Sequence, residues 1–539
     1  MFKTTLKTYH TLYTKDLGLY IAHSDNGNMV INGKMANRHG LIAGATGTGK
    51  TVTLQVMAET FCQAGVPCFM ADMKGDLSGI AKAGSMSSFI EKRKDSFGIP
   101  SPDFQGCPVR FYDVFGEQGH PIRATISQMG PQLLSRLLGL NDTQDGVLNI
   151  AFRIADERGL IILDLKDLRS VLDYVSKHSK EYTTQYGNIS SASVGAIQRA
   201  LLQLESQGAN KFFGEPAFDI KDLLAVEGGK GVMSVLAADK LMLQPKLYST
   251  FLLWMISELY STLPEVGDQE LPKLIFFFDE AHMLFDGTSK ALIDKIEQVI
   301  RLIRSKGVGI YFISQLPTDI PDNILGQLGN RVQHALRAYT PRDQKAVKVA
   351  AETFRANPEF STEEVITTLG TGEALVSFLD GNGAPSIVQK SKVLFPLSQI
   401  GALTEAERSD VMSRSTIGAK YDTPIDRESA YEILLAENQE TAMTETPQNS
   451  KGEVSTPTET KGAEKKKAGI LSKVLKAILT AVTATLGTIV GSAVSNKISG
   501  KKTKSKTSAG QRIIKNSTSA ATRTITRELT RDILGNLKF

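Results

Sequence analysis

Short apolar runs alternate with helical patterns along the first two thirds of the chain. Five runs are apolar almost throughout, as expected of parallel strands that are covered on both faces. They span residues 40–43, 66–71, 232–236, 274–278 and 309–313. Between them, apolar residues recur at helical spacing in 50–63, 245–263 and 289–305. Strands that alternate with helices predict an α/β fold with a mainly parallel sheet and right-handed crossovers.

The same patterns divide the chain into segments. Short strands around the tight-turn signal Asn26-Gly27 predict a hairpin-like segment over 1–35. The α/β core is expected at 36–130 and 228–400, interrupted by a helical insertion at 131–227. The remaining segments are a helical extension, a disordered linker rich in Thr, Glu, Ser, Pro and Lys, and a basic helical tail. They are expected at 401–439, 440–467 and 468–539.

Composition narrows the class of protein. The chain has 539 residues, of which 41% are hydrophobic and 22% charged, as in ordinary globular proteins. Collagens, coiled-coil rods and wholly disordered chains are thereby excluded. Three cysteines and no C-x-x-C pair argue against a disulfide scaffold and a zinc ribbon. The first residues lack the apolar region of a secretory signal, so a reducing, cytoplasmic location is expected.

Charge is distributed unevenly. The net charge is +5, yet residues 465–539 carry +14 and leave −9 for the rest. Residues 477–496 are uncharged and long enough to span a bilayer, but they also suit an Ala-rich helix that packs on protein. In the last helical pattern, Arg523, Arg527 and Arg531 lie opposite an apolar stripe. The tail 468–539 is therefore expected to contact nucleic acid or an anionic membrane, unless it serves only as a solvated tail.

The strongest chemical motif follows the first apolar run. Residues Gly44-Ala45-Thr46-Gly47-Thr48-Gly49-Lys50-Thr51 match the phosphate-binding pattern G-x-x-x-x-G-K-[ST] in full, and Val52 continues the helix. The glycines let backbone N–H groups surround phosphates, and the helix directs its positive end at them. Lys50 would neutralise phosphate charge, and the hydroxyl of Thr51 would bind Mg²⁺. The motif predicts a site for ATP and Mg²⁺.

A second motif ends the apolar run 274–278. Asp279 is placed to hold Mg²⁺ through water, and Glu280 to polarise the attacking water. Asp-Glu is also ordinary turn chemistry, but beside a complete phosphate loop the pair predicts hydrolysis. The spelling Asp-Glu-Ala-His ending at His282 matches one helicase superfamily, but we find neither its arginine-rich motif nor a second α/β core, so we interpret it as coincidence. Gln315 closes a later strand, where it would sense the γ-phosphate or only satisfy the backbone.

The order of these motifs resembles the HerA/FtsK group of hexameric DNA-pumping ATPases, and within it the short bacterial HerA-like NTPases. The segments 72–77 and 369–374 look like the group's acidic-Lys-Gly segment and late glycine turn. The resemblance implies a RecA-like P-loop core, a homo-hexamer, DNA as a partner and a nuclease as a further partner. It also implies an arginine donated in trans to a neighbour's site. Arg331 is our choice, with Arg304 and Arg337 as alternatives.

Two functions from different classes fit these features. The first is a motor in which ATP hydrolysis drives DNA translocation or remodelling. The second is a nucleotide-dependent scaffold or switch, tethered through the tail to a membrane or a partner protein. Stimulation of ATP hydrolysis by DNA would distinguish them.

Overall fold

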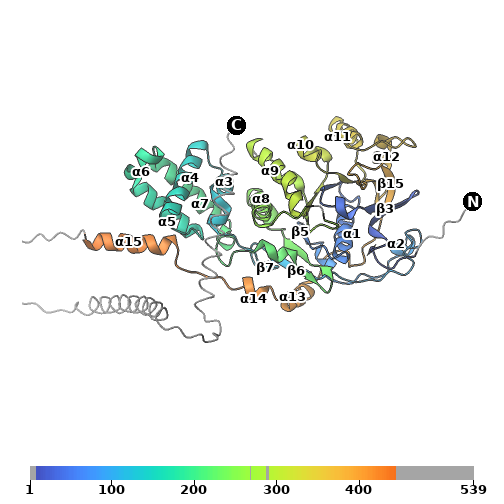
Figure 1. Ribbon diagram of the computed structural model, residues 1–539, viewed down its shortest axis with the longest axis horizontal. Helices are drawn as coiled ribbons and strands as arrows, with labels where there is room; N and C mark the ends of the chain where they lie inside the picture. Colours follow the sequence, from blue (N-terminus) through green and yellow to red (C-terminus); the bar gives the residue numbers. More distant parts are fainter. Residues whose placement is uncertain (1–7, 268, 287–289, 445–539) are drawn as a thin grey trace, which may run out of the picture. The chain divides into compact units, whose positions relative to one another are not determined.

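The computed structural model describes residues 8–267, 269–286 and 290–444 (Figure 1). Residues up to Thr441 form one compact unit, and a second unit begins at Ala442. The expected tail lies outside the described residues, as does the expected linker beyond residue 444. None of the helices within the described ranges is both long and apolar enough to cross a bilayer. The segment 477–496, for which a span was considered, lies outside them.

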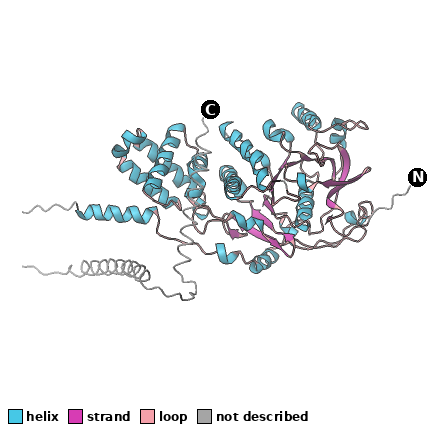
Figure 2. Cartoon of the chain, viewed as in Figure 1, coloured by secondary structure: helices cyan, strands magenta, loops and turns pink. Residues whose placement is uncertain are grey.

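One mixed sheet organises the compact unit (Figure 2). Thirteen strands of the described residues join it, and eight consecutive ones run parallel, in the order β13-β4-β12-β11-β5-β10-β6-β7. The mainly parallel α/β sheet expected from the sequence is confirmed. These strands are β4 (Gly40–Ala43), β5 (Cys68–Asp72), β6 (Val109–Asp113), β7 (His120–Pro121), β10 (Met233–Ala237), β11 (Leu274–Phe278), β12 (Val308–Ser314) and β13 (Asn330–Gln333).

The other five strands of this sheet run antiparallel to their neighbours and continue the sheet beyond β13. The order continues through β14 and β15 to the N-terminal strands, where β2 pairs with β15, β3 and β1. The expected hairpin-like segment therefore adds strands to the core sheet. Strand β15 was not predicted because its sequence, QKSKV, is polar except for Val393 and so shows no apolar strand pattern. The strands are β1 (Tyr13–Thr14), β2 (Gly18–Ser24), β3 (Gly27–Ile31), β14 (Glu373–Ser377) and β15 (Gln389–Val393).

Both faces of the parallel strands are buried. In β11, Phe277 packs into a cluster with Phe61 of α1 (Lys50–Gln63), on one face. Phe276 and Phe278 point to the other face and share a cluster with Trp254 of α8 (Pro245–Thr262). Because side chains alternate along a strand, a strand covered on both faces must be apolar throughout. This explains the unbroken run from which the strand was predicted.

The helical insertion packs beside α8 (Figure 1). Its helices share the core cluster of α8, and the Arg136 guanidinium donates to Ser249 Oγ at 3.1 Å. The insertion comprises α3 (Ile126–Leu138), α4 (Asp142–Glu157), α5 (Leu165–Lys177), α6 (Ser179–Tyr186) and α7 (Ser191–Ser206). Other helices are α2 (Ser88–Glu91), α9 (Lys290–Ile303), α10 (Asp322–Leu325), α11 (Pro341–Glu352) and α12 (Thr362–Thr368).

The C-terminal extension binds to both the sheet core and the insertion. It holds α13 (Glu405–Arg414), α14 (Gly418–Tyr421) and the start of α15 (Ala430–Thr444). Near the sheet, the Arg408 guanidinium stacks on the Phe111 ring at 4.6 Å. At the insertion, Asp167 Oδ1 accepts a 2.6 Å hydrogen bond from the Ser429 hydroxyl. The extension thus links two parts of the compact unit that are far apart in sequence.

Candidate active site

The predicted phosphate loop and acidic pair both lie at the carboxyl edge of the parallel strands. The phosphate loop follows β4, and Asp279 and Glu280 follow β11. Strand β12, which ends at Ser314, lies between β4 and β11. The ends of parallel strands form one edge, which is where ligands of open α/β sheets bind. The topology therefore brings together residues that are more than 200 positions apart.

The phosphate loop has the backbone of an anion-binding turn. Gly44, Gly47 and Gly49 have φ values of 154°, 80° and 114°, a region that L-residues with side chains rarely adopt. Helix α1 begins at Lys50 directly after the loop. The backbone N–H groups of Thr46, Gly47, Gly49 and Lys50 donate to no acceptor among the described residues. These nitrogens and the positive helix end are therefore free to hold phosphate oxygens.

Lys50 reaches back over the loop. Its ammonium donates to the carbonyls of Gly44 and Ala45 at 2.6 and 3.1 Å. Burial lowers the pKa of Lys50, an effect opposed by the negative charges of Glu280 and Asp279. The predicted nucleotide-binding set from Gly44 to Val52 thus forms one continuous loop and the first turn of α1.

The acidic pair is held in a specific geometry. Asp279 Oδ1 accepts the Glu280 N–H at 2.9 Å, and the Tyr248 hydroxyl of α8 donates to the Asp279 carbonyl at 3.1 Å. Burial and the neighbouring Glu280 raise the pKa of Asp279 to about 6, against the positive charges of Lys74 and Lys50. The two lysines and two acids therefore act on one another electrostatically within a single site.

Glu280 occupies a strained backbone conformation. Its φ and ψ are 47° and 51°, the left-handed region, which costs an L-residue roughly 1–2 kcal/mol. Such strain persists where the surrounding structure fixes a residue, and it is concentrated at active sites. The carboxylate lies 3.5 Å from His282 Nδ1. The strained turn thus places Glu280 directly beside Asp279.

The oxygen donors at this edge fit Mg²⁺ bound together with a nucleotide. Thr51 offers a hydroxyl and Asp279 a carboxylate, which are hard ligands of the kind that Mg²⁺ prefers. The described residues contain no group of three or more His, Cys, Asp or Glu that could hold a metal ion alone. Mg²⁺ commonly takes only one or two protein oxygens and completes its shell with water and phosphate.

Lys74 lies at this site too, although we predicted no separate role for it. It follows β5, next to β11 in the sheet, and its charge lowers the pKa of both Lys50 and Asp279. Asp72, at the end of β5, accepts the Leu77 N–H at 3.1 Å, and burial together with Asp76 raises its pKa to about 6. The segment 72–77, which carried part of the resemblance, therefore lies at the catalytic edge.

His334 supports the phosphate loop from β13 and was also missed. Its Nδ1 lies 2.9 Å from the Glu373 carbonyl and its Nε2 2.7 Å from Thr53 Oγ1 in α1. Because a carbonyl only accepts, Nδ1 carries the proton and Nε2 accepts from the hydroxyl. A Cβ on Gly44 would lie 2.5 Å from His334 Cβ, so the loop packs directly on this residue. Burial lowers its pKa to about 4 and keeps it neutral.

Gln315 lies at the same carboxyl edge as the phosphate loop and the acidic pair. It follows β12, between the loop strand β4 and the acidic strand β11. Its side chain is exposed and forms no hydrogen bond with the described residues. The backbone there is fixed by Asp319, which accepts from the Ser314 hydroxyl at 2.6 Å and the Leu316 N–H at 2.9 Å. Sensing of the γ-phosphate by Gln315 stays a prediction.

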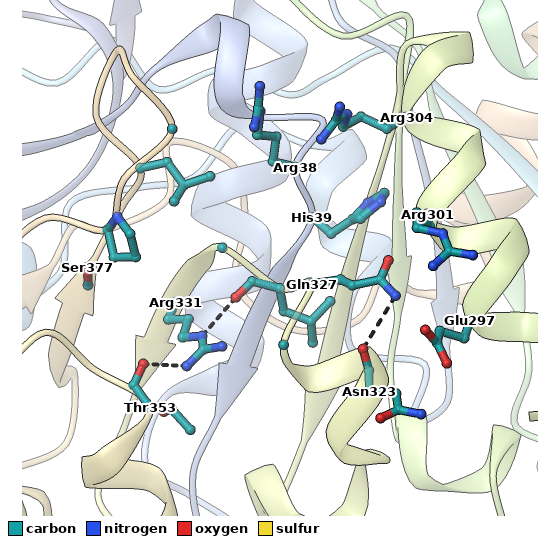
Figure 3. Close-up of a pocket in the computed structure, with 16 residues that line it drawn as sticks. Arg38, His39, Glu297, Arg301, Arg304, Asn323, Gln327, Arg331, Thr353 and Ser377 are labelled. Carbon is teal, nitrogen blue, oxygen red and sulfur yellow. Dashed lines mark hydrogen bonds between the residues drawn. The ribbon is translucent and has the colours of Figure 1, made fainter. Parts of the chain in front are cut away.

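Arg331 lies at the opposite edge of the sheet, in a cavity of about 620 Å³ (Figure 3). Its guanidinium donates to the carbonyls of Leu328 at 2.8 Å, Leu325 at 2.9 Å and Thr353. Arg304 lines the same cavity, but its exposed guanidinium forms no hydrogen bond or ion pair with the described residues. The third candidate, Arg337, follows β13 at the carboxyl edge and is exposed. The trans role of Arg331 stays a prediction.

Comparisons with known proteins were made against families, curated proteins and solved structures. No curated protein matches the chain. Among solved structures, the bacterial conjugative coupling protein TrwB is 14% identical, with a TM-score of 0.46 over 69% of this chain and 88% of that one. The structure of TrwB in complex with ADP and Mg²⁺ is 14% identical, with a TM-score of 0.45 over 68% of this chain and 89% of that one. VirB4 of Thermoanaerobacter pseudethanolicus is 16% identical, with a TM-score of 0.45 over 70% of this chain and 96% of that one.

The family comparison is more extensive. The model described as "Helicase HerA-like C-terminal" matches residues 19–539, which is nearly the whole chain. The resemblance predicted from the motifs is thereby confirmed, and it supports a nucleotide-dependent ATPase of the HerA/FtsK type. On this match, the chain belongs to the HerA-like helicase C-terminal family.

Proposed function

We propose that the protein hydrolyses ATP with Mg²⁺ at the carboxyl edge of its sheet. The observation that carries this proposal is the convergence of Lys50, Asp279 and Glu280 beside the free N–H groups of the phosphate loop. Lys50 and the loop nitrogens bind and orient the phosphates. Thr51 and Asp279 hold Mg²⁺, which supplies positive charge where negative charge develops. Glu280 orients the attacking water and accepts its proton.

The test compares nucleotide binding with turnover. Lys50→Ala should abolish nucleotide binding or turnover, because the loop loses its only side-chain cation. Glu280→Gln should retain binding and slow hydrolysis, because it removes the carboxylate but keeps the shape. Full activity in the Glu280→Gln protein would remove Glu280 from its assigned role.

We further propose a ring, most simply a homo-hexamer, in which a neighbour's arginine completes each site. The cavity at the opposite edge supports this, since it is lined by four arginines and one glutamate. The arginines are Arg38, Arg301, Arg304 and Arg331. Arg304 suits the trans role better than Arg331, because its guanidinium is exposed and carries no hydrogen bond within the described residues. A catalytic trans arginine must reach charge on another subunit.

Mass measurement by light scattering, with and without nucleotide, tests the ring. A strict monomer that hydrolyses ATP at full rate would exclude it. If the ring forms, Arg304→Ala should leave nucleotide binding intact and impair turnover. If only the Arg331 variant does so, then Arg331 is the trans arginine.

We propose that hydrolysis is coupled to DNA translocation or remodelling in the cytoplasm, with a nuclease as a further partner. Family membership supports this coupling. The test is the ATPase rate of the full chain with and without double-stranded DNA. Stimulation supports the motor, whereas a rate unaffected by DNA supports the alternative of a nucleotide-dependent scaffold or switch.

A further inference from the structure

The reacting phosphate and the base of a bound nucleotide must lie on opposite sides of the phosphate loop. Glu280 follows β11, two strands from β4 in one direction, so the γ-phosphate must lie on that side. In the other direction, β13 and β14 follow β4. The ribose and base therefore extend toward β13 and β14. This step rests on the proposed function, since it takes Glu280 as the residue that orients water.

The glycine turn before β14 borders the loop on that side. The Gly372 N–H donates to the Thr48 carbonyl at 3.0 Å. A Cβ on Gly49 would lie 3.4 Å from the Gly372 nitrogen, so the two backbones are in contact. Gly372 has a φ of 76°, a backbone conformation that residues with side chains rarely adopt.

Phe89 and Arg93 lie on the far side of this turn. A Cβ on Gly372 would be 3.2 Å from Arg93 Nη1 and 3.8 Å from Phe89 Cζ. The Arg93 guanidinium stacks on the Phe89 ring with its carbon 4.2 Å from the ring centre. An aromatic ring and a guanidinium thus lie next to Gly372, which itself contacts Gly49 of the phosphate loop.

The pair combines an apolar surface with an unused donor. Phe89 is 40% exposed although large apolar side chains usually find cover. Arg93 Nη1 is buried and has no hydrogen-bond partner among the described residues. A buried donor left unpaired costs about 1–3 kcal/mol, so the guanidinium is stabilised when it turns toward an acceptor.

The segment that carries the pair is fixed to the core. Ile90, next to Phe89, is buried in the same cluster as residues of α1. The Ser87 hydroxyl caps the turn by accepting the Ile90 N–H at 3.3 Å. Phe89 is therefore presented by an anchored turn, which lowers the ordering cost of binding a planar ligand.

We propose that Phe89 and Arg93 form the subsite for the purine base of the bound nucleotide. The base stacks on the Phe89 ring, and the Arg93 guanidinium turns toward the ligand to donate to a base nitrogen or a ribose oxygen. Stacking on an aromatic ring suits any base and is strongest for the larger purines. Phe89 therefore contributes affinity through the nucleoside and none through the phosphates.

The experiment separates these two parts of the ligand. Equilibrium binding to the full chain is measured with Mg²⁺ and either the non-hydrolysable analogue adenylyl imidodiphosphate or inorganic tripolyphosphate. Phe89→Ala should weaken binding of the analogue about tenfold, which corresponds to about 1.4 kcal/mol. Its affinity for tripolyphosphate should stay within about twofold of the unsubstituted protein. Phe89→Trp should retain the affinity for the analogue.

Met86 provides a matched control. It is an exposed apolar side chain of the same segment, 45% accessible, and Met86→Ala should leave both affinities unchanged. Equal affinity of the Phe89→Ala and unsubstituted proteins for the analogue would overturn the subsite. So would an equal loss for both ligands, because that indicates a disturbed phosphate loop. If the unsubstituted protein bound neither ligand, the proposed function itself would fail.

Discussion

Replacement of Arg331 should destabilise the fold far more than replacement of Arg304. The Arg331 guanidinium donates to three backbone carbonyls, those of Leu325, Leu328 and Thr353. Hydrogen bonds that involve a charged group each contribute roughly 1.5–3 kcal/mol net. In Arg331→Met the side chain keeps an unbranched apolar stem but loses the guanidinium and all three of its hydrogen bonds. Part of this loss is offset because the guanidinium no longer has to be desolvated, so we expect the free energy of unfolding to fall by about 3–5 kcal/mol.

The assay is urea unfolding of the full chain, followed by circular dichroism. Arg304→Met is the matched control, because its exposed guanidinium has no partner among the described residues, and its free energy of unfolding should change by less than about 0.5 kcal/mol. An Arg331→Met protein as stable as the control would refute the reasoning. It would show that the three bonds contribute nothing and that Arg331 is free to act on a neighbour.

Three further predictions follow from local geometry. His39 is buried and neutral: burial lowers its pKa to about 4, against the opposing effect of its hydrogen bond to the Ile300 carbonyl. Between pH 6.5 and 4 only the unfolded chain takes up this proton, so the free energy of unfolding should fall by up to about 1.4 kcal/mol for each unit by which the pH is lowered. In His39→Asn the urea midpoint should depend less on pH over this range. Gly44→Ala should abolish nucleotide binding in a calorimetric titration, because its Cβ would lie 2.5 Å from His334 Cβ at a φ of 154°. Deletion of 445–539 should leave basal ATP hydrolysis intact, since every predicted catalytic motif precedes residue 400. It should also flatten the salt dependence of binding to DNA or anionic vesicles. Unchanged binding would exclude the tail from that interaction.

Residues that act through contiguous motifs were predictable from the sequence. Lys50 and Thr51 belong to a complete loop pattern after an apolar strand, and Asp279 and Glu280 end another such strand. In both cases the chemistry and its structural context lie within ten neighbouring positions. The parallel order of the strands followed from their alternation with helices.

Residues that act across the fold were not predictable in this way. His334 supports a loop that lies about 290 positions earlier in the chain, and only the pairing of β13 with β4 brings them together. Phe89 and Arg93 lie in a loop-rich segment with no periodic pattern. Arg331 was chosen for its place near a late strand, but its three carbonyl partners come from turns whose geometry the sequence does not specify.

The rate of ATP hydrolysis by the purified full chain, with Mg²⁺ and with EDTA, tests the central claim most directly. The measurement is made on the unsubstituted protein and on Glu280→Gln, with nucleotide binding followed in parallel. We predict hydrolysis that requires Mg²⁺ and that slows at least about 100-fold in Glu280→Gln while binding persists, because the general base of a hydrolytic site contributes roughly that much. Mg²⁺-independent hydrolysis, or equal rates in the two proteins, would contradict the account.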